Sequence, residues 1–240
     1  KSTLLVDFAD DLEHPVCWYA LDAGDRDPHV FVDRLVLSLQ RRFPGFGEQT
    51  LRALSAASDL RGGAPGVVRV LVNEIVETIP QWFVLVLDDY HALGPAPEVD
   101  HIISNFVVYQ RDQCLTIIST RSVPELPDII SLVARGGVGG MGREEIRFNA
   151  AEIKELFAHN YDVDLSEQEA AELAGQSEGW VTGLLLTAYT RWRGVLQSWM
   201  RARDSNQPVY DYLTQEVFLQ QPSSVQTFLT RSSTLKEMSP

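Results

Sequence analysis

The chain has 240 residues, of which 45% are hydrophobic and 22% charged, as in an ordinary globular protein with a sizeable core. A formal net charge of −13 makes it a poor candidate for binding nucleic acid itself, because such binding relies on Lys and Arg to neutralise phosphates. No apolar run approaches the ~18 residues of a membrane span, and no secretory signal is visible, so we expect a cytoplasmic protein without membrane contact. Cys17 and Cys114 lie in apolar runs and are expected to be buried thiols, and no Cys/His cluster has metal-binding spacing.

The first residues have the pattern that ends a phosphate-binding loop. Lys1, Ser2 and Thr3 match the last part of G-x-x-x-x-G-K-[S/T] and lead into a helical pattern up to residue 11. In such a loop the ammonium neutralises the β- and γ-phosphates, the hydroxyl ligates Mg²⁺, and the helix N-terminus favours an anion. The alternative is a solvated N-terminus, since three residues are a weak signal. We expect the loop glycines and their strand upstream of Lys1, in a longer protein.

Strand and helix patterns alternate over residues 1–148. Apolar runs predict strands at 16–21, 82–87, 114–119 and 145–148. Helical periodicity predicts helices from residue 28, within 44–66, at 67–78 and at 99–109, with Asp27 as the cap of the helix that starts at Pro28. This order predicts an α/β fold with a parallel sheet, helices on both faces and right-handed crossovers.

Two carboxylates follow the second expected strand. Asp88 and Asp89 stand at the C-terminal tip of an apolar run, where open α/β sheets bind ligands. Asp88 would hold Mg²⁺ through water, and Asp89 would orient or activate an attacking water. Arg121, at the tip of the next strand, is positioned to sense a γ-phosphate. The alternatives are turn capping for the two acids and a surface charge for Arg121.

From residue 149 onward the pattern is helical only. Asn149 caps a helix over 150–161, and Ser166 with Glu169 forms a capping box for the next helix. We expect a small helical domain over 149–207 and the start of a third domain over 208–240, with helices at 209–220 and 223–231. Gly179 and Trp180 precede an apolar helix. From chemistry alone, a glycine-started helix with a core tryptophan is the preferred interpretation.

Four motifs in order resemble one family. They occupy residues 16–28, 84–91, 119–127 and 177–184. Together they closely resemble the STAND-class P-loop ATPase core of MalT-like, LuxR-type large transcriptional regulators, and residues 209–217 and 228–235 resemble the start of their winged-helix domain. The resemblance implies an NB-ARC-like nucleotide-binding domain, a small helical domain and a winged helix that close over ADP at rest. Exchange to ATP then permits oligomerisation.

The resemblance also implies a site for ATP or ADP with Mg²⁺. The residues that match the family's site are Lys1, Ser2, Thr3, Asp88, Asp89, Arg121, Gly179 and Trp180. Ser2 and Asp88 are the implied Mg²⁺ ligands, and Asp89 is the implied catalytic residue. Gly179 begins the motif that packs near adenine. Val181 stands where related ATPases carry a proline, which is a departure from that motif.

We therefore expect a signal-transducing ATPase switch, at most a slow ATP hydrolase. Its expected partners are further copies of itself on activation, an inducer bound by regions outside this chain, and DNA bound only by a C-terminal domain outside it. One alternative is a P-loop motor or remodelling ATPase with steady turnover, and another is a degenerate interaction module. With its central strand upstream, residues 1–240 alone are expected to bind nucleotide weakly and to be poorly stable.

Overall fold

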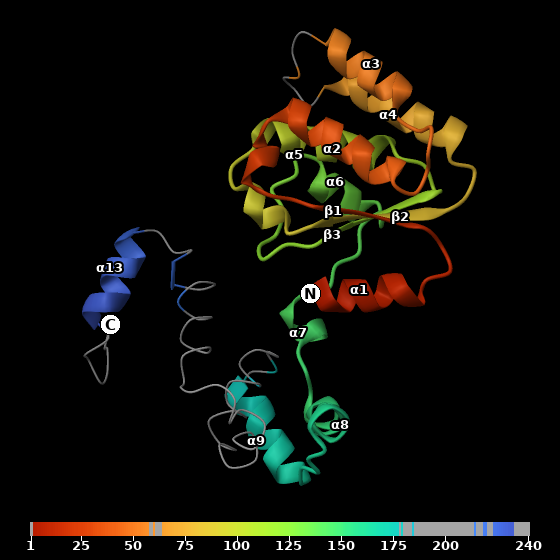
Figure 1. The fold of residues 1–240 in the computed structure, drawn as a ribbon. Helices are drawn as coiled ribbons and strands as arrows, with labels where there is room; N and C mark the ends of the chain where they lie inside the picture. The colour runs from red at the N-terminus through yellow and green to blue at the C-terminus, as the bar shows by residue number, and fades with distance from the viewer. Residues whose placement is uncertain are drawn as a thin grey trace, which may run out of the picture. The chain divides into compact units, whose positions relative to one another are not determined.

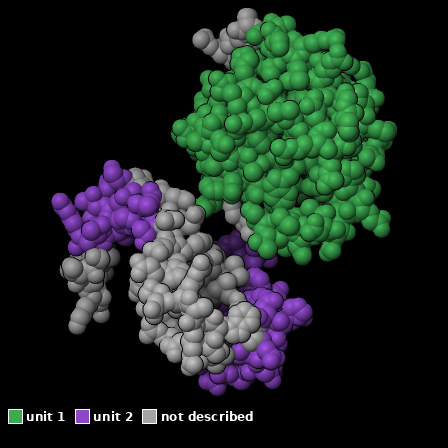
Figure 2. All heavy atoms as spheres, in the orientation of Figure 1, with its two compact units in different colours: residues 1–140 green, residues 141–240 purple. Residues whose placement is uncertain are grey.

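The computed structural model describes residues 2–57, 60, 64–177, 179, 184, 214, 218–219 and 223–232. The chain divides into two compact units, residues 1–140 and 141–240 (Figure 2). The first unit has a small parallel sheet of three strands flanked by helices, consistent with a P-loop NTPase-like core (Figure 1). The α/β fold class predicted from the alternating pattern is confirmed. The domain boundaries expected near residues 148 and 207 stay predictions.

The three strands of the sheet run in the same direction in the order β1-β2-β3. They are β1 (Val16–Ala20), β2 (Phe83–Asp88) and β3 (Cys114–Ile118). Every residue of β2 is buried, as its unbroken apolar run predicts for a strand covered on both faces. The register places Ala20 opposite Asp88, and Leu87 opposite Ile118. The three strands therefore end together, and the loops that follow them emerge at one carboxyl edge of the sheet.

Helices cover both faces of this sheet (Figure 1). On one face α1 (Ser2–Asp11) packs Leu5 and Ala9 against Val84 and Val86. On the other face lie α2 (Pro28–Gln40), α4 (Pro65–Thr78) and α5 (Pro97–Tyr109), whose apolar sides bury the larger core. Burying one leucine-sized side chain contributes about 1.5–3 kcal/mol, so this packing dominates the stability of the first unit. The other elements in the described part of this unit are η1 (Ala23–Arg26), α3 (Glu48–Ala56), η3 (Tyr90–Leu93) and α6 (Ile129–Ala134).

A buried carboxylate on α4 caps helix α3. Glu74 is 1% exposed and accepts hydrogen bonds from the backbone N–H groups of Gly47, Gln49 and Thr50 at 3.0, 3.0 and 2.8 Å. The Thr50 hydroxyl donates a fourth, at 2.6 Å. Burial opposes ionisation, but these hydrogen bonds outweigh it and lower the pKa of Glu74. Because α3 has no side-chain cap of its own, Glu74 supplies the acceptor that its first N–H groups need.

The second unit is helical in its described part. Its elements are α7 (Arg143–Ile146), α8 (Ala150–Tyr161), α9 (Glu167–Ser177) and α13 (Ser223–Ser232). The Asn149 side chain accepts from Glu152 N at 3.0 Å, and the Glu152 carboxylate accepts from Asn149 N at 2.8 Å, which confirms the predicted cap of α8. Ser166 and Glu169 exchange equivalent hydrogen bonds before α9. The buried core between these helices consists of Ile153, Phe157, Leu165, Ala170, Leu173 and Leu184.

The strand predicted over residues 145–148 is wrong. Residues Arg143–Ile146 form the short helix α7 instead. Two glutamates stand in its first turn, and the Glu145 carboxylate accepts from Gly142 N at 2.7 Å, so the acidic side chains lie where a helix N-terminus favours them. A four-residue alternation is compatible with either structure. Within the described residues no strand pairs with this segment, so the capping hydrogen bond of Glu145 favours the helix.

Several sequence predictions concern residues outside the described part of the chain. These are Lys1, Trp180, most of the apolar helix from residue 184 and most of the helix at 209–220.

Cys17 and Cys114 are buried free thiols, as predicted. Burial raises the pKa of each thiol to about 12, which leaves both unreactive near neutral pH. In the described part of the chain, no helix combines the length and apolar character that crossing a membrane requires.

Candidate functional site

The carboxyl edge of the sheet brings together the start of α1 and the end of β2. Asp88 is 5% exposed, and its Oδ1 atom accepts three hydrogen bonds. The donors are the Ser2 hydroxyl at 3.3 Å, the Ser119 hydroxyl at 2.6 Å and the backbone N–H of Asp89 at 3.0 Å. Ser2 and Asp88 are 86 positions apart in the sequence. The fold thus places in contact the two residues that sequence analysis named as Mg²⁺ ligands.

The oxygen atoms of this contact suit a hard cation. A hydroxyl that donates its one hydrogen to Asp88 still offers its lone pairs. Asp88 Oδ2 accepts no hydrogen bond from the described residues. Mg²⁺ prefers oxygen ligands and is usually held by one or two protein groups, with water and phosphate oxygens as its other ligands. One hydroxyl and one carboxylate are a donor set of this kind. Within the described residues there is no cluster of three His, Cys, Asp or Glu that could hold a metal ion.

Asp89 differs from Asp88 in backbone and exposure. Its φ and ψ of 55° and 38° are left-handed, a conformation that Asp tolerates better than most residues. Its side chain is 49% exposed, with Oδ1 3.8 Å from His91 Nδ1. The next residue is tied to β3's end, because Tyr90 N donates to Ser119 O at 2.9 Å. The second acid of the pair is therefore turned toward solvent while the first is buried.

Tyr90 anchors the turn that contains Asp89. The Tyr90 hydroxyl donates a hydrogen bond to Asp100 on α5. Burial, together with the adjacent Asp100 carboxylate, raises the pKa of Tyr90. Burial also raises the pKa of Asp100, although the Tyr90 hydroxyl lowers it in part. The hydrogen bond from the neutral Tyr90 phenol to Asp100 thus holds the loop after β2 against α5.

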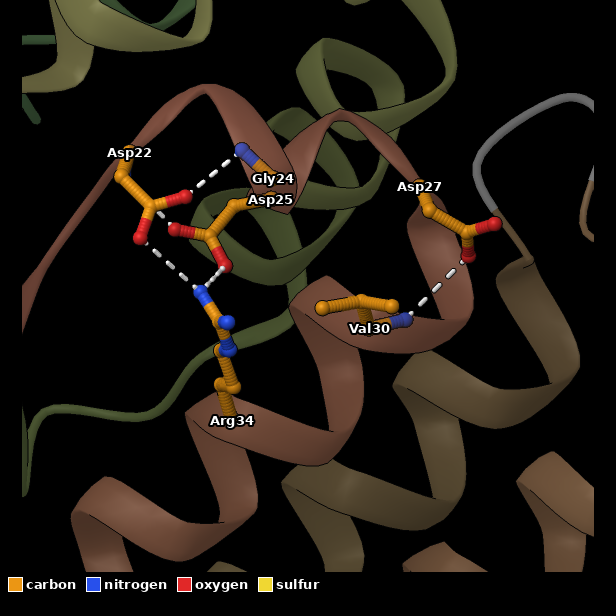
Figure 3. A network of polar contacts seen from close by, with 6 residues as sticks. All are labelled: Asp22, Gly24, Asp25, Asp27, Val30 and Arg34. Atoms are coloured by element: carbon orange, nitrogen blue, oxygen red, sulfur yellow. Dashed lines mark hydrogen bonds and ion pairs between the residues drawn. The ribbon is translucent and has the colours of Figure 1, made fainter.

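The loop after β1 contains a second buried carboxylate (Figure 3). Asp25 is fully buried, and Arg34 Nη1 donates to its Oδ1 at 2.7 Å and to Asp22 Oδ2 at 3.2 Å. The other Asp25 oxygen accepts from Asp22 N at 2.7 Å. Leu21 N donates to Asp88 O at 2.9 Å, so this loop begins directly beside the end of β2. Both oxygens of Asp25 therefore accept hydrogen bonds, and the Arg34 guanidinium balances its charge.

Two more contacts fix the same loop. The Asp27 side chain accepts from His29 N at 2.8 Å, which confirms the predicted cap of α2. It also accepts from Val30 N at 3.2 Å (Figure 3). Arg26 Nε donates to the backbone oxygen of Leu93. Since Leu93 ends η3, this contact joins the loop after β1 to the loop after β2.

The other residues predicted from sequence have different positions. Thr3 is exposed in the first turn of α1. Arg121 is exposed in the segment that follows β3, which the strand register places at the same carboxyl edge as Asp88. Lys1 lies outside the described residues. The structure thus gives Ser2, Asp88 and Asp89 defined contacts at one edge and places Arg121 in the next loop.

Gly179 belongs to the second unit and has a clear local role. Its φ is +70°, and its N–H donates to Ala174 O at 3.1 Å, as in a helix C-terminal cap. Its carbonyl accepts from Phe148 N at 2.9 Å. A Cβ at this position would lie 2.6 Å from Phe148 O, so only glycine fits. The local backbone explains this glycine, while its partner in the motif, Trp180, is not among the described residues.

Sequence analysis missed Ser119. It is 7% exposed, and its hydroxyl makes the shortest of the three hydrogen bonds to Asp88. The available signal was a small polar residue at the end of an apolar strand that neighbours the acidic tip. An uncharged serine is a weaker signal of a site than the charged Arg121 two positions later.

Comparison with known proteins identifies distant relatives. No family model matches the chain. The HTH-type transcriptional regulator MalT of Yersinia enterocolitica is 28% identical over 246 residues, which cover 99% of this chain and 26% of that protein. The MalT proteins of Yersinia pestis and Yersinia pseudotuberculosis are 27% identical over 245 residues.

The chain is a distant homologue of MalT regulators. The resemblance inferred from the four sequence motifs is therefore confirmed. The chain spans about a quarter of the length of these relatives, so the similarity concerns one part of such a regulator.

Proposed function

We propose that this chain is the nucleotide-binding module of a transcriptional regulator. The observation that carries the proposal is the hydrogen bond between Ser2 and the buried Asp88, at the carboxyl edge of a parallel sheet. Similarity to MalT supports the regulatory role. A hydroxyl at a helix N-terminus facing a strand-end carboxylate is the arrangement needed to hold Mg²⁺ on a bound di- or triphosphate.

The proposed ligand is ATP or ADP with Mg²⁺. Lys1 and Thr3 would bind phosphate oxygens together with the N–H groups at the start of α1. Ser2 would ligate the cation directly, and Asp88 would hold it through water. The cation, when bound, neutralises phosphate charge. Because this edge supplies few protein ligands, cation and nucleotide are expected to bind together.

Asp89 and Arg121 are assigned to the γ-phosphate. Asp89 would orient the attacking water and accept its proton, which suits a half-exposed carboxylate at the mouth of the site. Arg121 would compensate charge on the γ-phosphate and so distinguish ATP from ADP. We expect slow hydrolysis. In the second unit, Gly179 and Trp180 are proposed to pack near adenine when nucleotide is bound.

The module would act as a switch. ADP would occupy the resting state, and ATP would favour a state that self-associates. The inducer and the DNA would be bound by other parts of the regulator, in agreement with this chain's net charge of −13. We propose a cytoplasmic location for the whole protein.

The test is the nucleotide content of the natural full-length protein. Nucleotide released on denaturation would be identified by chromatography, and ATP and ADP affinities would be measured by calorimetry with Mg²⁺ and with a chelator. We expect co-purified ADP and turnover well below one per minute. Asp88→Ala should abolish the Mg²⁺-dependent part of the affinity. Asp112→Ala, the same change in the exposed turn before β3, is the matched control.

Two outcomes would contradict the proposal. A protein that neither carries nor binds nucleotide would be an interaction module that retains the fold only. Fast, steady turnover would indicate a motor or remodelling ATPase instead of a switch.

A further inference from the structure

We propose that Ser119 is a positioning residue that fixes the orientation of the Asp88 carboxylate, so that Oδ2 is the oxygen presented to the Mg²⁺ shell. The proposal rests on the proposed function. Ser119 itself touches neither cation nor nucleotide in this role. It holds one carboxylate oxygen toward the protein donors, so that the other points toward the proposed cation.

Ser119 is bound to the end of β2 at three successive places. Its N–H donates to Leu87 O at 2.9 Å, and its carbonyl accepts from Tyr90 N at 2.9 Å. Between them its hydroxyl donates to Asp88 Oδ1 at 2.6 Å. Because the backbone is held on both sides of Asp88, the hydroxyl is presented at a fixed place. A carboxylate that receives an O–H donor at this distance makes a strong, charge-assisted hydrogen bond.

The three hydrogen bonds to Oδ1 are unequal, and the difference assigns their roles. The Ser119 hydroxyl is at 2.6 Å in a buried setting, whereas the Ser2 hydroxyl is at 3.3 Å and only partly buried. The longer contact with Ser2 is the one that can shift when its oxygen turns to a cation. The shorter contact with Ser119 remains.

Turning the plane of the Asp88 carboxylate away from its present orientation would break the hydrogen bonds from Ser119, Ser2 and the Asp89 N–H. A half-turn merely exchanges two equivalent oxygens and restores the same three hydrogen bonds. The carboxylate therefore has one strongly preferred orientation. Preorganisation of this kind strengthens cation binding because no reorientation is needed when the cation arrives.

The test separates cation binding from nucleotide binding in the natural full-length protein. Binding of ADP would be titrated at saturating Mg²⁺, with a chelator, and over a Mg²⁺ series that gives the concentration for half-maximal enhancement. We expect Ser119→Ala to raise that concentration about tenfold, the loss expected for one hydrogen bond to a charged group. ADP affinity with the chelator should change less than about twofold. Ser119→Thr, which retains the hydroxyl, should restore the wild-type Mg²⁺ requirement to within about threefold.

A purely structural role for Ser119 gives different results. Ser119→Ala would then lower the unfolding midpoint but shift ADP affinity equally with and without Mg²⁺, or shift neither, and either result would overturn the proposal. If Ser119→Ala is too unstable to assay, Ser119→Cys provides a weaker donor of similar size. An intermediate Mg²⁺ requirement would support the proposal, and a wild-type requirement would overturn it.

Failure of the proposed function is distinguishable from failure of this inference. A wild-type protein that binds no nucleotide removes the basis of both. A wild-type protein whose ADP binding is enhanced by Mg²⁺, with an unchanged requirement in Ser119→Ala, removes only the role of Ser119.

Discussion

The loops after β1 and β2 each contain a buried carboxylate, but the two are satisfied differently. Asp25, after β1, is bound by the guanidinium of Arg34 at 2.7 Å and uses both oxygens. Among the described residues, the donors to Asp88 at the end of β2 are two hydroxyls and one N–H group, and all three converge on one oxygen. A buried carboxylate is expensive unless a cation or hydrogen-bond donors satisfy its oxygens. In the first loop Arg34 supplies the cation, and under the proposed function Mg²⁺ would supply it in the second.

Under the proposed function, this difference separates an acid that stabilises the fold from one that holds a cation, at the same edge of the sheet. Both carboxylates are buried, so burial alone does not distinguish Asp88 from Asp25. They differ in how many carboxylate oxygens accept hydrogen bonds from the described residues: two in Asp25 and one in Asp88. Glu74 agrees with this distinction, since both of its oxygens are used to cap α3.

The largest predicted effect comes from removing the Arg34 cation. Arg34→Ala leaves the fully buried Asp25 carboxylate without its cation. Solvent screens the half-exposed Arg34, so we expect a smaller loss than for a fully buried ion pair, but the largest loss of stability among these variants. Native-state hydrogen exchange of the β1 and β2 amides would measure the loss. Arg41→Ala, at the exposed C-terminal cap of the same helix α2, is the control. Equal protection in both variants would remove the distinction between the loops.

Glu74→Gln is expected to cost about 2 kcal/mol. The amide replaces one acceptor oxygen with a donor that faces backbone N–H groups, leaving buried groups unsatisfied. Hydrogen exchange of the backbone amides in α3 (Glu48–Ala56) would measure this local loss of stability.

The pH dependence of the same helix provides a second check. Because the pKa of Glu74 is lowered on folding, its contribution is present above the unfolded value of about 4.3 and is lost as pH falls through the folded value. Protection of α3 should therefore decline below about pH 4 in the wild type and decline less in Glu74→Gln. Equal acid sensitivity in the two proteins would show that another group is responsible.

Tyr90→Phe is expected to have the smallest effect. It removes the hydroxyl that fastens the Asp89 turn to Asp100, worth about 1 kcal/mol as a single buried hydrogen bond. Loss of protection at the amides of η3, with β1 unaffected, would support this local role. A change at β1 of the same size would mean that the two loops unfold together.

The sequence predicted the parallel sheet well because its strands are strongly patterned. The apolar run that ends at Asp88 predicts a fully buried parallel strand, which β2 is, and the Asp88 side chain contacts Ser2 of α1. The segment 145–148 could not be predicted, because four alternating residues fit either structure and capping by Glu145 selects a helix. Ser119 was missed because its role depends on a contact between strands, 31 positions apart.

The most direct test of the central claim is Mg²⁺-dependent ADP binding by Asp88→Asn in the natural full-length protein, beside Asp25→Asn. The account predicts that Asp88→Asn loses the Mg²⁺ enhancement while its β2 amides keep their protection without nucleotide. Asp25→Asn should do the reverse, with reduced protection and a Mg²⁺ enhancement retained in the folded fraction. If Mg²⁺ enhances ADP binding equally in Asp88→Asn and the wild type, the second loop is not a cation site and the account is wrong.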